Sequence, residues 1–556
     1  MQPHGARDGR EVEANRLRGR RGNVNTRHED QTKNTPRVAM TDADVSNMLD
    51  RYQYPAEVRA TIEKEHLLPR GLLSRLQANY PQHSDFMRTD RLMFVDSRKY
   101  AGLKGFHEIV DILKNNGIEL DHIEERELFI KVYRFMATGH VLNSIQWDDF
   151  NNDPLFTLVF PQPGMIQEDT ERAYLGTSSE DAQQEIIEGY MGKTNPHDGN
   201  QLLNKPWFEN ANGEVEFVEG SQHKYPQCQL IFDKTTQDCF AFCTYCFRHA
   251  QVRGDEDMFC QRDVGQIIEY LKQHKEVTDI LITGGDAGYM PVERLREYVM
   301  PIIEDPELVH IRTVRLGTRV LTYLPEMILT PEYDEMLELF DTMYDHGIQL
   351  AWMAHFSTPR EVLNATAVAA IRRLQLHHVV LRSQSPMMNQ ISRFTDADGN
   401  VDVDRTAQNW IDLALVLGTM HIGFHSMYLA RPTGEHHYFT TPLADVAKIA
   451  DKIHRDLASI YRPTRYISMT SSAGKISLLG TADVGGEKAF ALKFTEGRNM
   501  EWLNGVFLAK FDEKQNTIDL LDPLDKPEFF FRQNLKEIED ALVKALEGRK
   551  FAKVES

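Results

Sequence analysis

The stretch from Asp238 to Arg253, DCFAFCTYCFRHAQVR, places Cys239, Cys243 and Cys246 in a CxxxCxxC spacing. Cysteine thiolates are the usual ligands of a [4Fe–4S] cluster, in which each iron needs one outside ligand. Three cysteines on four irons leave one iron open. An open iron can chelate the amino and carboxylate groups of S-adenosylmethionine and pass an electron into its sulfonium. The stretch therefore predicts a cluster loop.

A structural zinc site is the alternative interpretation of the same cysteines. Structural zinc normally has four Cys or His ligands, commonly from two paired knuckles. The sequence has no second CxxC, although His249 could supply a fourth ligand. The spacing also matches the radical-SAM signature. The aromatic residues Phe240, Phe242, Tyr245 and Phe247 between the cysteines suit a loop that excludes water. We favour the cluster over zinc.

The composition is that of a globular protein with few cysteines. The chain has 556 residues, 41% hydrophobic and 26% charged, with a formal net charge of −20. This acidity argues against nucleic acid or an anionic membrane as a partner. Five cysteines fit a reducing compartment, and no run of 18 apolar residues occurs. The basic N-terminus is not followed by an apolar segment typical of a secretory signal. We expect a cytoplasmic protein.

The chain divides into four regions that differ in composition and in the spacing of their apolar residues. Residues 1–39 carry nine Lys/Arg and five Asp/Glu, and their polar composition predicts a disordered basic tail, with Met40 as an alternative start. Residues 40–220 show helical spacing of apolar residues, beginning with Thr41 or Asp42 as a helix cap. Residues 221–480 alternate short apolar strands with amphipathic helices. Residues 481–556 form a C-terminal region that ends in a helix.

The alternation in residues 221–480 predicts an α/β fold with a parallel sheet. The expected strands are 228–234, 279–285, 310–317, 348–356, 377–384, 420–430 and 465–471. Enzymes with such sheets act at the carboxyl ends of their strands. Gly284, Gly285 and Asp286 follow one of these strands directly. The two glycines let backbone approach a ligand closely, and the acid could hold the methionyl amine of S-adenosylmethionine.

A series of ordered motifs resembles the lysine 2,3-aminomutase family, radical-SAM enzymes that also use pyridoxal 5′-phosphate. The matches, in family order, are Tyr225–Pro226, the cysteine loop, Gly284–Ala287, Arg315–Arg319, His355–Pro359, Gln384–Ser385, Phe439–Pro442 and Gly474–Ile476. The resemblance covers roughly residues 220–480. It implies a partial (β/α)6-type radical-SAM barrel, with a mainly helical N-terminal extension and a C-terminal tail.

The resemblance also implies roles for single residues. Lys475 matches the family lysine that forms a Schiff base with pyridoxal phosphate, although the family's glycines before it are here Ser471-Ser472-Ala473-Gly474. Arg248 resembles the arginine that binds the substrate α-carboxylate. Lys224 and Arg319 are candidate phosphate ligands, and Gln384 a candidate cofactor contact. The family's structural zinc is not expected, because no cysteine follows Cys260.

Two positions bear on the substrate. In the lysine enzyme, two aspartates bind the distal ammonium of the substrate. One lies ten residues before the Thr-Pro pair, and the other lies seven residues before the lysine that forms the Schiff base. Those positions are here Arg431 and Ser468. An arginine would repel an ammonium and suits a carboxylate instead. The alternative is that Arg431 pairs with an acid such as Glu435. The pattern resembles the glutamate 2,3-aminomutases more than the lysine enzyme.

We therefore predict an isomerase that moves the α-amino group of an amino acid to the β-carbon, with glutamate or another acidic amino acid as the expected substrate. A radical-SAM rearrangement of a different amino acid and a cysteine-zinc interaction module are the alternatives. The expected partners are the small-molecule substrate, an electron donor such as flavodoxin or ferredoxin, and further copies of the chain in a homo-oligomer.

Overall fold

The computed structural model describes residues 39–194, 202–249, 260–431 and 434–552. Most of the predicted basic tail, residues 1–38, lies outside the described residues. None of the helices in the described ranges is both long and apolar enough to cross a membrane.

Parallel strands form the centre of an 11-stranded sheet with the order β15-β14-β13-β12-β11-β10-β9-β8-β7-β6-β5. The parallel strands are β6 (Cys228–Phe232), β7 (Asp279–Thr283), β8 (Thr313–Thr318), β9 (Gln349–Ala354), β10 (Val380–Met387), β11 (Gly423–Leu429) and β12 (Ser468–Thr470). Each matches an expected strand. Strand order follows chain order, as right-handed crossovers produce. The α/β prediction with a (β/α)6-type arrangement is confirmed.

The helices between these strands cover one face of the sheet. They are α12 (Val264–Gln273), α13 (Val292–Glu304), α14 (Val320–Tyr323), α15 (Asp334–Asp345), α16 (Ala365–Leu376), α17 (Val403–Thr419), α18 (His436–Phe439) and α19 (Leu443–Asp456). Strand residues alternate between this face and the opposite one. In β8, Val314 and Leu316 are buried, whereas Arg315 and Gly317 line a cavity. One face of the sheet is therefore packed against helices, and the other lines that cavity.

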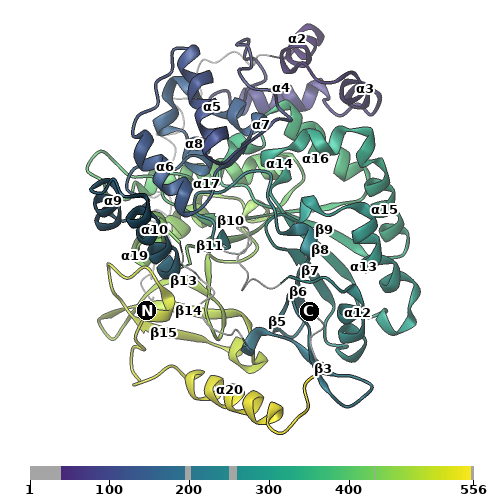
Figure 1. The fold of residues 1–556 in the computed structure, drawn as a ribbon, viewed down its shortest axis with the longest axis vertical. Coiled ribbons are helices and arrows are strands. Elements are labelled where there is room, and N and C mark those ends of the chain that lie inside the picture. Colours follow the sequence, from purple (N-terminus) through teal and green to yellow (C-terminus); the bar gives the residue numbers. More distant parts are fainter. Residues whose placement is uncertain (1–38, 195–201, 250–259, 432–433, 553–556) are drawn as a thin grey trace, which may run out of the picture.

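The N-terminal region is mainly helical and gathers at one end of the molecule (Figure 1). Its helices are α2 (Asp42–Tyr52), α3 (Ala56–Lys64), α4 (Arg70–Asn79), α5 (Gly102–Asn115), α6 (Ile123–Val132), α7 (Gly139–Ser144), α8 (Pro154–Val159), α9 (Glu168–Leu175) and α10 (Glu180–Thr194). Strands β1 (Lys99–Ala101) and β2 (Met136–Thr138) form a separate antiparallel pair. Thr41 caps α2 in a capping box with Asp44, so of the two expected caps the structure uses Thr41.

Antiparallel strands extend both edges of the sheet. At one edge, β5 (Ser221–Tyr225) pairs with β6. At the other, β13 (Gly474–Val484), β14 (Glu487–Gly497) and β15 (Val506–Lys510) form a meander that follows β12. The sequence pattern predicts a sheet that ends near residue 480, so this meander is an addition to the predicted fold. Strands β3 (Trp207–Glu209) and β4 (Val215–Phe217) form a small sheet of their own. Helix α20 (Arg532–Leu546) lies near β15, at the end of the molecule opposite the N-terminal helices (Figure 1).

Candidate active site

A cavity of about 300 Å³ lies at the carboxyl ends of the parallel strands. Thr283, Thr318 and Thr470, the last residues of β7, β8 and β12, all line it. So does every residue to which the sequence analysis gave a site role. These are Lys224, Cys239, Cys243, Cys246, Arg248, Gly284, Gly285, Asp286, Arg319, Gln384, Arg431, Ser468 and Lys475. Residues that are up to 251 positions apart (475 − 224) thus share one cavity.

The cysteine loop follows β6 and is held by the N-terminal region. The backbone N–H of Phe242 donates to the Met136 carbonyl at 2.7 Å, which extends the loop along β2. The backbone N–H of Thr244 donates to the Leu158 carbonyl at 3.0 Å. Arg134 forms an ion pair with Asp238 at 2.8 Å, next to Cys239. The helical region, to which the sequence assigned no role, therefore positions the cysteine loop.

Burial disfavours the charged form of the three thiols. It raises the pKa of Cys239 well above its usual value, with further contributions from Cys246 and Asp286. Burial and the neighbouring Cys243 raise the pKa of Cys246 to about 12. The Cys243 sulfur lies 2.9 Å from the Tyr323 hydroxyl. A bound metal cluster would supply the positive charge that three buried thiolates require.

The separation of the sulfurs bears on the zinc alternative. A tetrahedral zinc ion with sulfur bonds of about 2.3 Å draws its ligand atoms to about 3.8 Å from one another. Among the described residues, three potential metal ligands have ligand atoms that all lie within 4.8 Å of one another: His223, His274 and Glu276. The three cysteines do not form such a group. The three sulfurs are therefore not gathered as closely as the ligands of one zinc ion, so the structure gives the zinc alternative no support of its own.

Gly284 and Gly285 let the β7 loop pass close to the cysteine loop. A Cβ at Gly285 would lie 2.5 Å from the Asp238 carbonyl oxygen and 3.0 Å from the Cys239 sulfur. A Cβ at Gly284, which has φ +145°, would lie 2.5 Å from the Thr236 hydroxyl. The backbone N–H of Gly285 donates to the Thr236 carbonyl at 2.7 Å. The close approach expected of these glycines is thus to another loop of the protein.

Asp286 and Arg319 are already engaged by protein groups. Asp286 accepts hydrogen bonds from the backbone N–H of Gly288 at 2.8 Å and of Arg319 at 2.9 Å. Burial raises the pKa of this carboxyl to about 6. The Arg319 guanidinium pairs with Glu361 at 3.0 Å and donates to the Tyr245 hydroxyl at 2.5 Å. These contacts weaken the case for Arg319 as a phosphate ligand.

Lys475 is the second residue of β13 and lies beyond the strand expected over residues 465–471. Its amine forms an ion pair with Glu496 of β14 and lies 5.5 Å from the ring centre of Tyr225 and 5.6 Å from that of Tyr428. Burial disfavours the ammonium form of Lys475. The nearby oxygens of Tyr428, Glu496 and Tyr225 have a larger opposite effect, so the pKa of Lys475 is raised. Lys475 and Arg465 hold the pKa of Glu496 at about 2 against the effect of burial.

Gly474 is required by packing. A Cβ here would lie 2.4 Å from the Glu496 carbonyl oxygen and 2.9 Å from the Gly497 Cα. The absent side chain lets β13 and β14 meet beside the lysine. The residues that replace the family's glycines form a tight turn, in which the backbone N–H of Ser471 donates to the Gly474 carbonyl at 2.7 Å.

Three cations of the cavity form no ion pair among the described residues, although Asp519 lies near enough to favour the Lys224 ammonium. In the described part of the chain, Lys224, Arg248 and Arg431 form no ion pair, and the pairing of Arg431 with Glu435 that we considered does not occur. Glu435 instead accepts hydrogen bonds from the hydroxyls of Tyr133 and Tyr190, at 2.6 and 2.9 Å. Such a cavity favours anionic ligands.

Burial and mutual repulsion weaken the protonation of these cations. Burial, with Arg431 nearby, lowers the pKa of Arg248 to about 9. Burial also lowers the pKa of Arg431. Both guanidinium groups lie over the Phe247 ring, at 5.2 and 4.8 Å. Burial together with Arg498, Arg431 and Lys475 lowers the pKa of Lys224 to about 7.

Ser468 and Gln384 add neutral polar groups. Ser468 is fully buried, and its hydroxyl has no hydrogen-bond partner among the described residues. Because buried hydroxyls are normally paired, this one suits a ligand in the cavity. The Gln384 amide lies 3.1 Å from the His355 ring and accepts from the Tyr428 hydroxyl at 3.2 Å.

Several residues of the cavity were missed by the sequence analysis. Glu496, Tyr428 and Arg315 line it, and Glu496 pairs with the candidate lysine. Glu496 comes from the meander that was not predicted, so no local pattern pointed to it. Tyr428 stands near the carboxyl end of an expected strand, which is a signal that could have found it.

The fold and the cavity define an α/β protein whose functional centre lies at the carboxyl ends of a parallel sheet and contains a cysteine trio.

No protein-family model matches the chain. A putative L-lysine 2,3-aminomutase of Aquifex aeolicus is 28% identical over 267 residues, which is 48% of this chain and 66% of that protein. A glutamate 2,3-aminomutase of Clostridioides difficile is 23% identical over 256 residues, 46% of this chain and 54% of that protein. A crystal structure of a radical SAM methyltransferase from Sphaerobacter thermophilus matches with a TM-score of 0.29 and 12% identity over 54% of this chain and 86% of that one.

These relatives confirm the resemblance to the lysine 2,3-aminomutase family that the motifs indicated. The alignments span less than two thirds of the length of these two curated relatives. Proteins named for lysine and for glutamate both match, so the greater likeness to the glutamate enzyme stays a prediction.

Proposed function

We propose that the chain is a radical-SAM, pyridoxal phosphate-dependent 2,3-aminomutase that acts on an acidic amino acid, with glutamate as the first choice. One observation carries the proposal. A single cavity brings together the cysteine trio, the Lys475 amine and cations that form no ion pair among the described residues. The similarity to proteins named 2,3-aminomutase supports the reaction class.

The residues of the cavity suit the cofactors that this function requires. Cys239, Cys243 and Cys246 would hold the [4Fe–4S] cluster, and the Lys475 amine, which lies near the Tyr225 and Tyr428 rings, would carry pyridoxal phosphate. When bound, the cluster with S-adenosylmethionine supplies a carbon radical that removes hydrogen, and pyridoxal phosphate supplies a conjugated ring for the migrating nitrogen. Lys224 is the stronger phosphate candidate, since Arg319 is paired with Glu361.

The remaining residues would bind and orient the substrate. Arg248 would hold the α-carboxylate and Arg431 the distal carboxylate, each as a charge-assisted hydrogen-bond donor. The unpaired Ser468 hydroxyl would add a neutral hydrogen bond. A lysine side chain would place an ammonium beside Arg431 without a counterion, which disfavours it. The buried Phe240 and Phe242 would keep water from the cluster side of the cavity.

The wider parts of the proposal follow from this chemistry. The cluster needs a reductant, for which flavodoxin or ferredoxin is the expected class. A cytoplasmic location, a homo-oligomer and the absence of a nucleic-acid or membrane partner belong to the proposal as well.

An anaerobic assay tests the proposed function. Reconstituted protein is incubated with dithionite, S-adenosylmethionine, pyridoxal phosphate and one amino acid at a time, and β-amino acids are separated and identified by mass. We expect conversion of glutamate and no conversion by Lys475→Ala. Conversion of lysine without glutamate would overturn the substrate assignment, and no conversion of any amino acid would overturn the reaction.

A further inference from the structure

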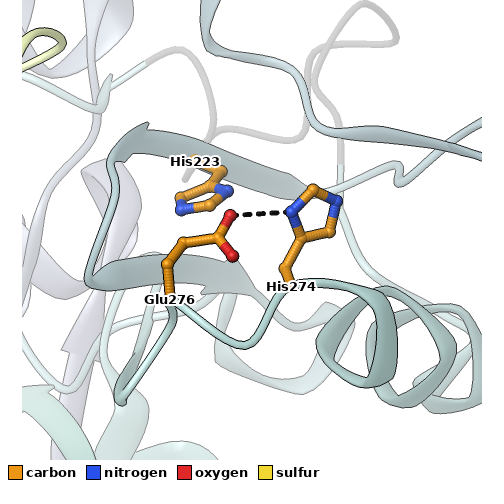
Figure 2. A group of neighbouring side chains, drawn as sticks. All are labelled: His223, His274 and Glu276. Carbon is orange, nitrogen blue, oxygen red and sulfur yellow. Dashed lines mark hydrogen bonds and ion pairs between the residues drawn. The ribbon is translucent and has the colours of Figure 1, made fainter.

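A group of side chains that could bind a metal ion lies outside the cavity. His223 belongs to β5, His274 is the C-cap of α12, and Glu276 lies in the loop that leads to β7. One ligand atom from each lies within 4.8 Å of the other two, and Figure 2 shows the three side chains turned toward one another. None of the three lines the cavity, whereas Lys224 and Tyr225, the next residues of β5, do.

Neighbouring groups hold the two imidazoles in place. The His223 Nε2 lies 3.0 Å from the Pro226 carbonyl oxygen, so this nitrogen carries the proton and Nδ1 carries the lone pair. Metal-bound histidines commonly donate their other ring N–H to a carbonyl in this way. The His274 ring stacks on Tyr270 with ring centres 3.9 Å apart. The His274 Nδ1 also lies 2.9 Å from the Glu276 carboxylate.

Charge and accessibility also suit a cation. Glu276 offers a carboxylate oxygen, which attracts a cation, beside the two imidazoles. The side chains of His274 and Glu276 are 30% and 48% exposed, so an ion can enter from solvent. The Tyr270 hydroxyl now lies 2.6 Å from His223 Nδ1 and would give up this contact to a metal ion.

We propose that His223, His274 and Glu276 bind one divalent transition-metal ion of borderline softness, of the Zn²⁺ class. Two imidazoles and one carboxylate are a known zinc ligand set that leaves a fourth position to water. Nitrogen donors disfavour Mg²⁺ and Ca²⁺, which prefer oxygen. Bonds of about 2.1 Å bring tetrahedral ligands to about 3.4 Å from one another. Rotation of the exposed Glu276 side chain narrows the remaining gap. The ion would tie β5 to α12 and the β7 loop.

Cobalt binding to the full chain tests the site, because Co²⁺ reports its ligands in its absorption. Thiolates give intense sulfur-to-metal charge transfer, whereas nitrogen and oxygen ligands give only weak visible bands, so the cysteine trio and the proposed site are distinguished. We expect one Co²⁺ per chain with nitrogen and oxygen ligands. Its affinity should fall by at least ~10-fold in His274→Ala and Glu276→Gln, since loss of an outer-shell partner alone costs about 10- to 100-fold.

The control is His377→Ala. His377 Nδ1 also faces a carboxylate, that of Asp341 at 2.8 Å, but this pair has no third ligand among the described residues. The variant should bind Co²⁺ like the unchanged protein. Zn²⁺ should raise the melting temperature of the unchanged protein more than that of His274→Ala. A spectrum with thiolate bands alone, or equal affinity in His274→Ala, would overturn the proposal. The cavity residues are untouched, so the outcome is independent of the aminomutase assay.

Discussion

Arg431 is the residue on which the proposed substrate depends. Its guanidinium lies over Phe247 and has no ion pair in the described ranges, so a substrate carboxylate would be its natural counterion. In Arg431→Gln we expect kcat/KM for glutamate to fall about 30- to 4,000-fold, because loss of one partner of a buried charge pair costs about 2–5 kcal/mol. Steady-state kinetics with the reconstituted enzyme measures this.

Arg405→Gln is the matched control for that variant. Arg405 lies over the Phe394 ring at 4.4 Å, a similar aromatic contact, but it does not line the cavity. Its kcat/KM should stay unchanged. If Arg405→Gln loses as much activity as Arg431→Gln, the loss reflects packing and Arg431 does not bind the substrate.

Glu496 controls the proton on Lys475. Its carboxylate helps to raise the pKa of Lys475 above the usual value, against the effect of burial. Removal of that charge in Glu496→Gln should lower the pKa of Lys475, so that the neutral, reactive amine forms at lower pH. Trapping with pyridoxal phosphate and borohydride across a pH series measures the midpoint, which should move to lower pH. A midpoint that stays in place or rises would contradict the role of Glu496, and the exposed Glu501→Gln serves as the control.

At the scale of elements, Gly474 fixes how β13 meets β14. Alanine at this position would place its Cβ 2.4 Å from the Glu496 carbonyl oxygen, which is backbone and cannot rotate away. We expect Gly474→Ala to lower the free energy of unfolding by about 1–3 kcal/mol, as overpacking does, and to weaken pyridoxal phosphate binding. Urea unfolding and absorbance titration measure the two effects. Gly505→Ala has open space around its Cβ and φ −139°, so it should change neither.

Sequence pattern predicted the parallel strands because each is a short apolar run bounded by turn residues and followed by an amphipathic helix. It missed the β13–β14 hairpin, although Gly485 and Gly486, with φ +64° and +89°, are a hairpin signal. The carboxyl ends of parallel strands meet by topology, and this explains why all predicted site residues share the cavity. Ion pairs such as Lys475–Glu496 could not be predicted, because they depend on the register of a strand pair.

At the scale of the whole molecule, the acidic chain has a cavity that is rich in cations, and this contrast favours the binding of an anionic ligand. The chain carries a formal net charge of −20, yet its cavity contains three cations that form no ion pair in the described residues. Confining these charges in a partly buried space is unfavourable until an anion joins them. Anion binding should therefore stabilise the entire fold, because a ligand that binds only the folded state raises its stability by mass action.

The pH dependence of that stabilisation follows from Lys224. Burial and neighbouring cations lower its pKa to about 7, below the usual 10.5. Between these values the unfolded chain binds more protons than the folded one, so this group makes the free protein more stable as pH rises through about 7. An anion beside Lys224 favours the charged amine, and its binding should be tighter below pH 7 than above. Sulfate, which stays a dianion across this range, should therefore raise the melting temperature more at about pH 6 than at about pH 8.5. The difference should shrink in Lys224→Met but persist in Lys488→Met, because Lys488 contacts the Phe511 ring outside the cavity. An equal sulfate effect at both pH values would show that Lys224 does not face the bound anion.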